Sequence, residues 1–549
     1  MKRILKVFLK VFLFIILFIP VYAKAATYDV NSAIMFKALL STGADMKITG
    51  DFTIDGNYQV NAASTIDLNG HTINLKGNTL LPYESLTIKD TSSDQSGKMI
   101  GSGTFLFQVG NSTIPGSLTI EGGTFETNGS YGIVNNLGTF TLNGGTLKGK
   151  SFVVYNRKNF EMNDGSIISS TGTSVYVNND ATFIMNGGNI TLTGDYYAIG
   201  LCKPGAKVII NDGTIEAMYS NPEGTSGGNA IGAFKGTEVT INGGTLKSYG
   251  VTMLGNGSDS GPNEGTNAKF NINGGTLNST ISAAIYAPQV NGLTTITGGN
   301  LTGKTGVEIR AGKLIISGGT INADTENYVV TDNTNGVTTK GAAISVVQHT
   351  TKQPIEVIIT GGNFSGNVPV SGTNPLNHSS DITDKVTYDI SGGIFTSSSD
   401  TTVTVIGDNR FITGGDFSNK VTNYVVDGYG EKDLTHNYVR VLPYRKINIA
   451  EGTDYDVVDL YTVFPSDEIE IKPKYKKGYE VEEIIVIDYD GNRITVTNNK
   501  FLMPNKDVTI SIKYKKINNP PTGDNILIYI VGLVISILLL LILKKKRKY

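Results

Sequence analysis

A short hydrophobic pattern recurs along most of the chain. In each copy, apolar and polar residues alternate, two small residues follow, and an apolar residue comes soon after them, as in Leu118–Phe125 and Phe140–Leu147. Alternation is the period of a β-strand with one buried face. The residues before the small pair in the further copies are Asn163, Asn186, Asn211, Asn242, Asn273, Thr297, Ser317, Thr360, Ser391 and Thr413. We therefore predict strands throughout this region.

Each repeat also contains a second short apolar segment, such as Phe152–Val154 or Val175–Val177. One repeat then holds two or three short strands and no helix, and a unit of this size cannot bury its apolar face alone. Stacked units bury it through parallel ladders. The pattern predicts an all-β fold, a right-handed parallel β-helix over residues 61–420. The long step from Ser317 to Thr360 is interpreted as two coils, with a degenerate repeat at residues 341–345.

Residue choice at the small pair supports stacking. Glycine supplies a positive φ at a corner and allows close approach of neighbouring coils. The preceding residue is Asn in six repeats, and stacked Asn amides can bond to one another along a solenoid. The alternative is a row of ligand-binding side chains. We prefer the ladder, because it satisfies buried amides in coil after coil.

The start of the repeat region has the features of a cap, which we place at residues 26–60. Asn31 or Ser32 can begin a short helix that ends before Gly43 and carries Ile34, Met35, Phe36, Leu39 and Leu40 on an apolar side. Such a helix would cover the open edge of the first coil. The following segment, Ser64–Ile73, resembles an early coil of pectin-lyase-like β-helix proteins. The body from about 27 to 420 resembles this superfamily as found in Gram-positive surface proteins. The resemblance implies a fold and says little about activity.

After Phe417 the pattern changes. Residues 421–516 are predicted to form a small all-β spacer domain, with strands near 468–472, 484–487 and 508–512 and a hairpin turn at Asp490–Gly491. The run from Gly478 to Ile510 is similar to the small β-repeat modules found beside cell-wall anchors.

The N-terminus, residues 1–25, is typical of a secretory signal peptide. Lys2, Arg3, Lys6 and Lys10 precede an apolar run over Val11–Val21, and Ala23–Ala25 supplies small residues for cleavage. The alternative is a membrane anchor. The run is short and contains Pro20, which favours the signal peptide.

Residues 517–549 combine three elements in a fixed order: Asn519-Pro520-Pro521-Thr522-Gly523, an uncharged segment over Ile526–Leu543, and a basic tail. The uncharged segment predicts a C-terminal transmembrane helix. The whole resembles a sortase sorting signal, with Asn519 where Leu is usual. The resemblance implies sortase and peptidoglycan as partners, Thr522 joined to the cell wall, and an extracellular location. The alternative is a plain membrane anchor.

Charge excludes one class of partner. The whole chain has a net charge of −2, but residues 26–522, between the two basic ends, carry −11. An acidic body argues against nucleic acid. The single cysteine, Cys202, excludes a disulfide scaffold and is interpreted as a small core residue. No cofactor or metal site is predicted.

Related β-helix proteins include polysaccharide lyases and hydrolases, so catalysis is the alternative function. A hydrolase requires converging carboxylates, and a lyase requires a base with acids that hold calcium. Asp164 and Asp212 lie at the corner of their repeats, where they are interpreted first as turn residues. We find no group of three acids in neighbouring repeats and predict no catalytic residue.

Long excursions between repeats are the predicted binding regions. They span 217–228, 255–268, 324–340 and 366–384, and their Tyr219, Tyr328 and His378 can stack on sugars. The expected function is adhesion to host or cell-surface glycans or proteins, or surface display, without catalysis. The alternatives are a wall-displayed polysaccharide lyase or glycoside hydrolase and a structural coat component.

Overall fold

The computed structural model describes residues 26–255, 267–331, 336–348, 353–374, 384–407, 410–452, 455–457, 463–518 and 525–545. The chain divides into two compact units. The first comprises residues 1–426 and 433–441, and the second comprises residues 427–432 and 442–549.

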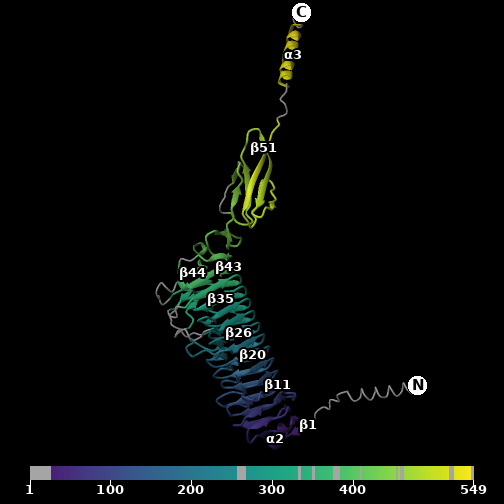
Figure 1. The fold of residues 1–549 in the computed structure, drawn as a ribbon, viewed down its shortest axis with the longest axis vertical. Helices are drawn as coiled ribbons and strands as arrows, with labels where there is room; N and C mark the ends of the chain where they lie inside the picture. The colour runs from purple at the N-terminus through teal and green to yellow at the C-terminus, as the bar shows by residue number, and fades with distance from the viewer. Residues whose placement is uncertain are drawn as a thin grey trace, which may run out of the picture. The chain divides into compact units, whose positions relative to one another are not determined.

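The first unit is a parallel β-helix in which each full coil contributes three strands, and each strand pairs with its equivalents in the coils before and after (Figure 1). The equivalent strands of successive coils form three rows, which we number 1 to 3 in the order in which the chain passes through them. Rows 1 and 2 belong to one 31-stranded sheet, and row 3 is a 14-stranded sheet. Row 1 consists of β1 (Thr27–Val30), β2 (Asp45–Ile48), β5 (Ser64–Asp67), β8 (Ser85–Lys89), β11 (Ser117–Ile120), β14 (Thr139–Leu142), β17 (Asn159–Met162), β20 (Thr182–Met185), β23 (Lys207–Ile210), β26 (Glu238–Ile241), β29 (Lys269–Ile272), β32 (Leu293–Ile296), β35 (Gly312–Ile316), β40 (Ile355–Ile359), the long β43 (Val386–Ser397) and β45 (Ile412–Phe417).

Row 2 consists of β3 (Phe52–Thr53), β6 (Thr72–Lys76), β9 (Lys98–Gly101), β12 (Thr124–Thr127), β15 (Thr146–Gly149), β18 (Ser166–Ser169), β21 (Asn189–Leu192), β24 (Thr214–Ala217), β27 (Thr245–Ser248), β30 (Thr276–Ser279), β33 (Asn300–Thr302), β36 (Thr320–Asn322) and β41 (Asn363–Gly366). Row 3 consists of β4 (Tyr58–Val60), β7 (Leu80–Pro82), β10 (Phe107–Val109), β13 (Val134–Asn136), β16 (Val154–Asn156), β19 (Val175–Val177), β22 (Tyr197–Leu201), β25 (Asn229–Ala233), β28 (Met253–Leu254), β31 (Ala283–Tyr286), β34 (Thr305–Ile309), β39 (Ile344–Val347), β42 (Val370–Thr373) and β44 (Val403–Val405).

The core lies inside the three rows, because alternate residues of the short strands point inward and are buried. Identical side chains stack between coils. Phe140, Phe160 and Phe183 form one stack, with ring centroids 4.7 and 4.6 Å apart. Phe364, Phe395 and Phe417 form another at 4.6 and 4.7 Å. The alternation predicted from sequence is therefore the inward–outward alternation of the coils.

The glycine pairs form the corner between rows 1 and 2. Gly145 has a φ of +81°, and a Cβ at Gly144 would lie 2.5 Å from the carbonyl oxygen of Glu121 in the preceding coil. The preceding Asn residues form the predicted ladder: each amide from Asn163 to Asn273 donates to the Asn of the coil before, at 2.8–2.9 Å. These amides are exposed, whereas the prediction placed them in a buried environment.

Two of the sequence interpretations of this unit are wrong. The step from Ser317 to Thr360 is one coil, because β35 pairs directly with β40 and β36 with β41. The extra residues form an excursion that contains the antiparallel pair β37 (Val329–Val330) and β38 (Thr339–Lys340). In the cap, α2 (Ala33–Thr42) buries Phe36 and Leu40, but Ile34 is 82% exposed and Met35 is also exposed. Only one side of this short helix faces the first coil.

The chain passes between the units through η2 (Thr422–Tyr424), β46 (Tyr429–Asp433) and β47 (Val439–Pro443). The second unit contains a sheet of β48 (Ile447–Ile449), β54 (Val508–Lys516), β51 (Tyr479–Asp488) and β52 (Arg493–Ile494), and a sheet of β49 (Tyr455–Val457), β50 (Glu468–Pro473) and β53 (Lys500–Leu502). Its core includes Ile471, Val486, Phe501 and Ile510.

The C-terminal segment forms α3 (Asn525–Lys545). No helix within the described residues is long and apolar enough to cross a membrane, so the predicted C-terminal transmembrane helix is wrong.

Candidate functional site

Several predicted functional residues lie outside the described residues. These are the signal peptide, the motif Asn519-Pro520-Pro521-Thr522-Gly523, and His378. The other two predicted ligand-contact residues, Tyr219 and Tyr328, are described, and the structure places them in separate excursions from the β-helix.

Tyr219 lies in a self-contained loop between β24 and β25. Ser220 and Gly227 form an isolated antiparallel bridge across the loop. Asn221 Oδ1 accepts hydrogen bonds from the backbone N–H groups of Thr225 and Ser226, at 2.8 and 3.2 Å. The Tyr219 ring is half-buried. These bonds make the excursion an ordered turn, and its tyrosine is only partly accessible.

Tyr328 holds its excursion against the β-helix. Its hydroxyl is 2.7 Å from Ser371 Oγ on row 3, and burial raises the pKa of the phenol. We use the name covering hairpin for the described residues 324–331 and 336–341, which include β37 and β38. The hydroxyl of Tyr328 therefore already has a partner within the chain.

Beneath the covering hairpin lies a fully buried ion pair, Glu308 with Arg310, both on or next to β34. Arg310 Nε donates to Glu308 Oε1 at 3.2 Å, and its guanidinium also donates to the Gly336 carbonyl and the Thr338 hydroxyl. The backbone N–H groups of Thr338 and Thr339 donate to the Glu308 carboxylate at 2.8–3.0 Å. Burial raises the pKa of Glu308, and Arg310 opposes that effect. The pair fastens the hairpin over row 3.

A second contact holds the base of the covering hairpin. The carboxylate of Asp324, 6% exposed, lies 3.1 Å from the ammonium groups of both Lys304 and Lys340. Burial opposes ionisation, but the Glu326 N–H and the two ammonium groups hold the pKa of Asp324 well below its usual range. Asp324 is therefore a charged structural residue.

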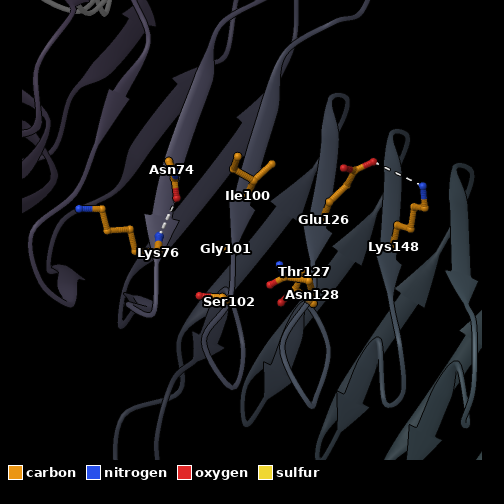
Figure 2. Close-up of a pocket in the computed structure, with 9 residues that line it drawn as sticks. All are labelled: Asn74, Lys76, Ile100, Gly101, Ser102, Glu126, Thr127, Asn128 and Lys148. Atoms are coloured by element: carbon orange, nitrogen blue, oxygen red, sulfur yellow. Dashed lines mark hydrogen bonds and ion pairs between the residues drawn. The ribbon is translucent and has the colours of Figure 1, made fainter.

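A shallow groove of about 470 Å³ lies on the outer face of row 2, near the N-terminal end of the β-helix (Figure 2). Glu126 on β12 and Lys148 on β15 point toward each other across neighbouring strands, 3.7 Å apart, and both are exposed. The rest of the lining is mostly small and polar: Asn74, Lys76, Ile100, Gly101, Ser102, Thr127 and Asn128. The groove offers one carboxylate, which is engaged by a lysine.

The carboxylates at the corner of the repeats are turn residues, as the sequence suggests. Asp164 and Asp212 each accept a hydrogen bond from the N–H of the following glycine at 2.7 Å. Among the described residues no group of three or more His, Cys, Asp or Glu side chains is arranged to hold a metal ion.

A cluster of aromatic side chains on the outer face of row 3 was missed by the sequence analysis. We use the name aromatic patch for Phe105, Tyr131, Phe152, Tyr155 and Tyr176. Tyr155 and Tyr176 are the outward residues of β16 and β19, stand in register, and stack with centroids 5.0 Å apart. Phe105, Tyr131 and Phe152 come from the turns that lead into row 3, and each lies within 6.5 Å of another ring of the patch.

The patch combines apolar rings with available hydroxyl groups. Within the described residues, the phenol hydroxyls of Tyr131, Tyr155 and Tyr176 make no hydrogen bond to protein, and Tyr131 is 43% exposed. Burial raises the pKa of Tyr176 to about 12, with smaller effects from Cys202 and Tyr155. The Arg157 guanidinium lies over the Tyr155 ring at 4.7 Å. The patch can stack against a ligand and exchange hydrogen bonds with it.

A spacing signal for the patch exists in the sequence. Phe152 and Tyr155 are three residues apart around a buried Val pair, and aromatic residues recur at similar places in neighbouring repeats. Only their stacking between coils shows that they converge, because the turn before row 3 varies in length.

No protein-family model matches this chain, and neither the curated proteins nor the solved structures include a match.

Proposed function

We propose that the protein is a cell-wall-displayed surface protein that mediates adhesion and is attached through Thr522. The β-helix acts as the displayed body, and the second unit separates it from the attachment point. The observation that carries the adhesive part is the aromatic patch, because solvent-facing clusters of Tyr and Phe with an adjacent Arg are typical of binding surfaces.

The attachment rests on the sequence at both ends. The N-terminal segment contains the sequence elements of a secretory signal in the usual order, and the C-terminal segment resembles a sortase signal in the same way. In the reaction that this resemblance implies, the Thr522–Gly523 bond breaks, the Thr522 carbonyl forms a thioester with the sortase, and a peptidoglycan amine displaces the enzyme to give an amide. Gly523 leaves with the C-terminal segment.

Attachment is tested with Thr522→Ala in the producing cell. We expect the variant to disappear from the covalent wall fraction after boiling in detergent, whereas the wild type is released only by muramidase. Thr495→Ala is the matched control, since Thr495 is an exposed threonine of the second unit. If Thr522→Ala remains covalently bound to the wall, the attachment proposal is wrong.

Adhesion is tested separately with cells that lack the protein. More cells that display the wild-type chain than cells that lack it are expected to remain attached, after washing, to surfaces coated with host or cell-surface glycans or proteins. Equal retention on every surface tested contradicts the adhesive role, whatever the result with Thr522→Ala.

A further inference from the structure

We propose that the aromatic patch binds a neutral polysaccharide chain that lies along the axis of the β-helix. This inference rests on the proposed adhesive function and names the class of partner. It moves the predicted sugar contacts from the excursions to the outer face of row 3.

The position of the patch suits an extended ligand. Its residues come from four consecutive coils, those that contain β10, β13, β16 and β19. With coils about 4.8 Å apart, the patch extends over ~15 Å along the axis. Aromatic residues continue in the next two coils. The ring centroids of Tyr196 and Tyr197 are 5.2 Å apart, and those of Tyr197 and Phe234 are 5.7 Å apart.

The chemistry of the patch matches a sugar ring. A pyranose has apolar C–H faces and hydroxyl edges, and a tyrosine likewise has an apolar ring with a polar tip. The three unbonded phenol hydroxyls supply donors and acceptors beside the rings. Asn135 occupies the same outward column, one coil before Tyr155, and its Oδ1 is a buried atom with no hydrogen-bond partner within the described residues.

The charge of the protein favours a neutral chain. None of the five patch residues carries a charge, and Arg157 already lies over a patch ring. The body of the protein, residues 26–522, has a net charge of −11. An acidic polysaccharide would be repelled at long range by this body.

One of the patch residues, Phe152, has a strained backbone conformation. Phe152 has a φ of +46°, a conformation that a bulky residue seldom adopts. A Cβ at Gly132, beneath this turn, would lie 2.0 Å from the Phe152 carbonyl oxygen. Strained positions of this kind concentrate at ligand sites, and here the strain directs an aromatic side chain outward into the patch.

The size of the patch argues against a protein partner. A stable protein interface buries ~800 Å² on each side. A whole aromatic side chain offers ~150–250 Å², and four of the five patch residues are no more than partly exposed. The remaining surface is too small for a stable protein interface but large enough for a few sugar rings.

The test is affinity electrophoresis of the purified full-length chain in gels that contain mannan, dextran, galactomannan or hydroxyethylcellulose, with polygalacturonate as the acidic comparison. We expect at least one neutral polymer to retard the protein. The double variant Tyr155→Ala/Tyr176→Ala should bind that polymer about tenfold more weakly, since it loses two stacking rings.

Two further variants keep the test interpretable. Tyr155→Phe/Tyr176→Phe retains both rings and should give intermediate retardation with an unchanged unfolding temperature. Tyr475→Ala/Tyr489→Ala removes two tyrosines of the second unit that are 87% and 85% exposed, and should bind as the wild type does. The chain has no tryptophan but 26 tyrosines, so the change in tyrosine fluorescence on adding polymer is compared between the wild type and the patch variants.

Four results would overturn the proposal, and three of them concern polysaccharide binding. These are no retardation by any neutral polymer, binding that the patch variants leave unchanged, and stronger binding to polygalacturonate. A concentration-dependent dimer abolished by the patch variants would identify a second copy as the occupant and would also overturn it. The proposed attachment and adhesion are tested on cells, so they can survive each of these outcomes.

Discussion

The outer face of row 3 differs between two stretches of the same β-helix. Between β10 and β19 the outward column holds Tyr155 and Tyr176, and both residues are half-exposed. Between β34 and β42 the same column holds Glu308, Ser345 and Ser371, all fully buried. The backbone pairing is the same in both, but the second stretch is covered by the chain's own hairpin.

The difference shows what each type of side chain demands. Glu308 and Arg310 cannot be buried without partners, and the covering hairpin supplies them through the N–H groups of Thr338 and Thr339. The carboxylate of Glu308 is therefore hydrogen-bonded by groups of the same chain. Half-exposed aromatic rings need no such cover, so their hydroxyls remain available to a ligand. A face of this fold is closed or open according to one column of residues.

The largest expected effect comes from breaking the buried pair. Glu308→Ala leaves Arg310 buried beside two N–H donors without their acceptor, and we expect a loss of about 3–5 kcal/mol in the free energy of unfolding. Urea unfolding followed by circular dichroism measures it. Glu356→Ala is the control, since its ion pair with Lys313 at 2.9 Å is partly exposed, and we expect a loss below ~1 kcal/mol. Equal losses would mean that the hairpin is not held by Glu308.

A medium effect is expected from adding one methyl group to row 3 at two places, on β34 in the covered stretch and on β25 outside it. In Gly306→Ala the new Cβ would lie 2.3 Å from the Ala343 carbonyl oxygen, in backbone that cannot move aside, and we expect a loss of about 1–3 kcal/mol. In Gly232→Ala the Cβ meets the Tyr197 ring at 2.5 Å, and a side chain can turn away. Thermal unfolding should therefore rank Gly306→Ala as the more harmful. The reverse order would show that β25 is at least as tightly packed as the covered stretch.

The smallest effect concerns pH at the base of the covering hairpin. The folded pKa of Asp324 is below its ordinary value of 3.8, so its stabilising effect is present above that value and is lost as the pH falls through it toward the folded pKa. Wild type should be more stable than Asp324→Asn at pH 6, and the gap should narrow below about pH 4. Unfolding at a series of pH values measures the gap, and taking the difference removes contributions from other groups such as Glu308. A gap that is constant down to pH 3 would contradict the role of Asp324.

Much of the β-helix follows from local pattern. Strand alternation and the glycine corner are encoded within each repeat, and the Asn ladder within six of them. These features can therefore be predicted from a single sequence. The excursion after β36 was not, because its length imitates an additional coil. Only the direct pairing of β35 with β40 shows that it leaves the stack and returns.

The candidate sites could be predicted from the sequence to a smaller extent than the fold. Tyr328 has the exposed-loop setting of a ligand contact in sequence, but its hydroxyl meets Ser371, more than forty residues away. The aromatic patch needs rings from four coils with different turn lengths, and no local pattern places them together. Buried partners such as Glu308 and Thr338 depend on how an excursion folds back, which periodicity does not specify.

The glycine corner restricts how such a protein can change. A side chain at Gly144 would meet backbone of the coil before it, and the same holds for Gly274, Gly298 and Gly318. Every long excursion leaves from one of the other two corners of its coil. The longest insertions are therefore found on two edges. The third edge is more restricted, although it holds the eight-residue turn 90–97 between β8 and β9 and has Asp164 and Asp212 in place of the first glycine of the pair. For engineering, this makes the turns around row 3 the natural places to graft new loops, and the glycine edge a place to leave untouched.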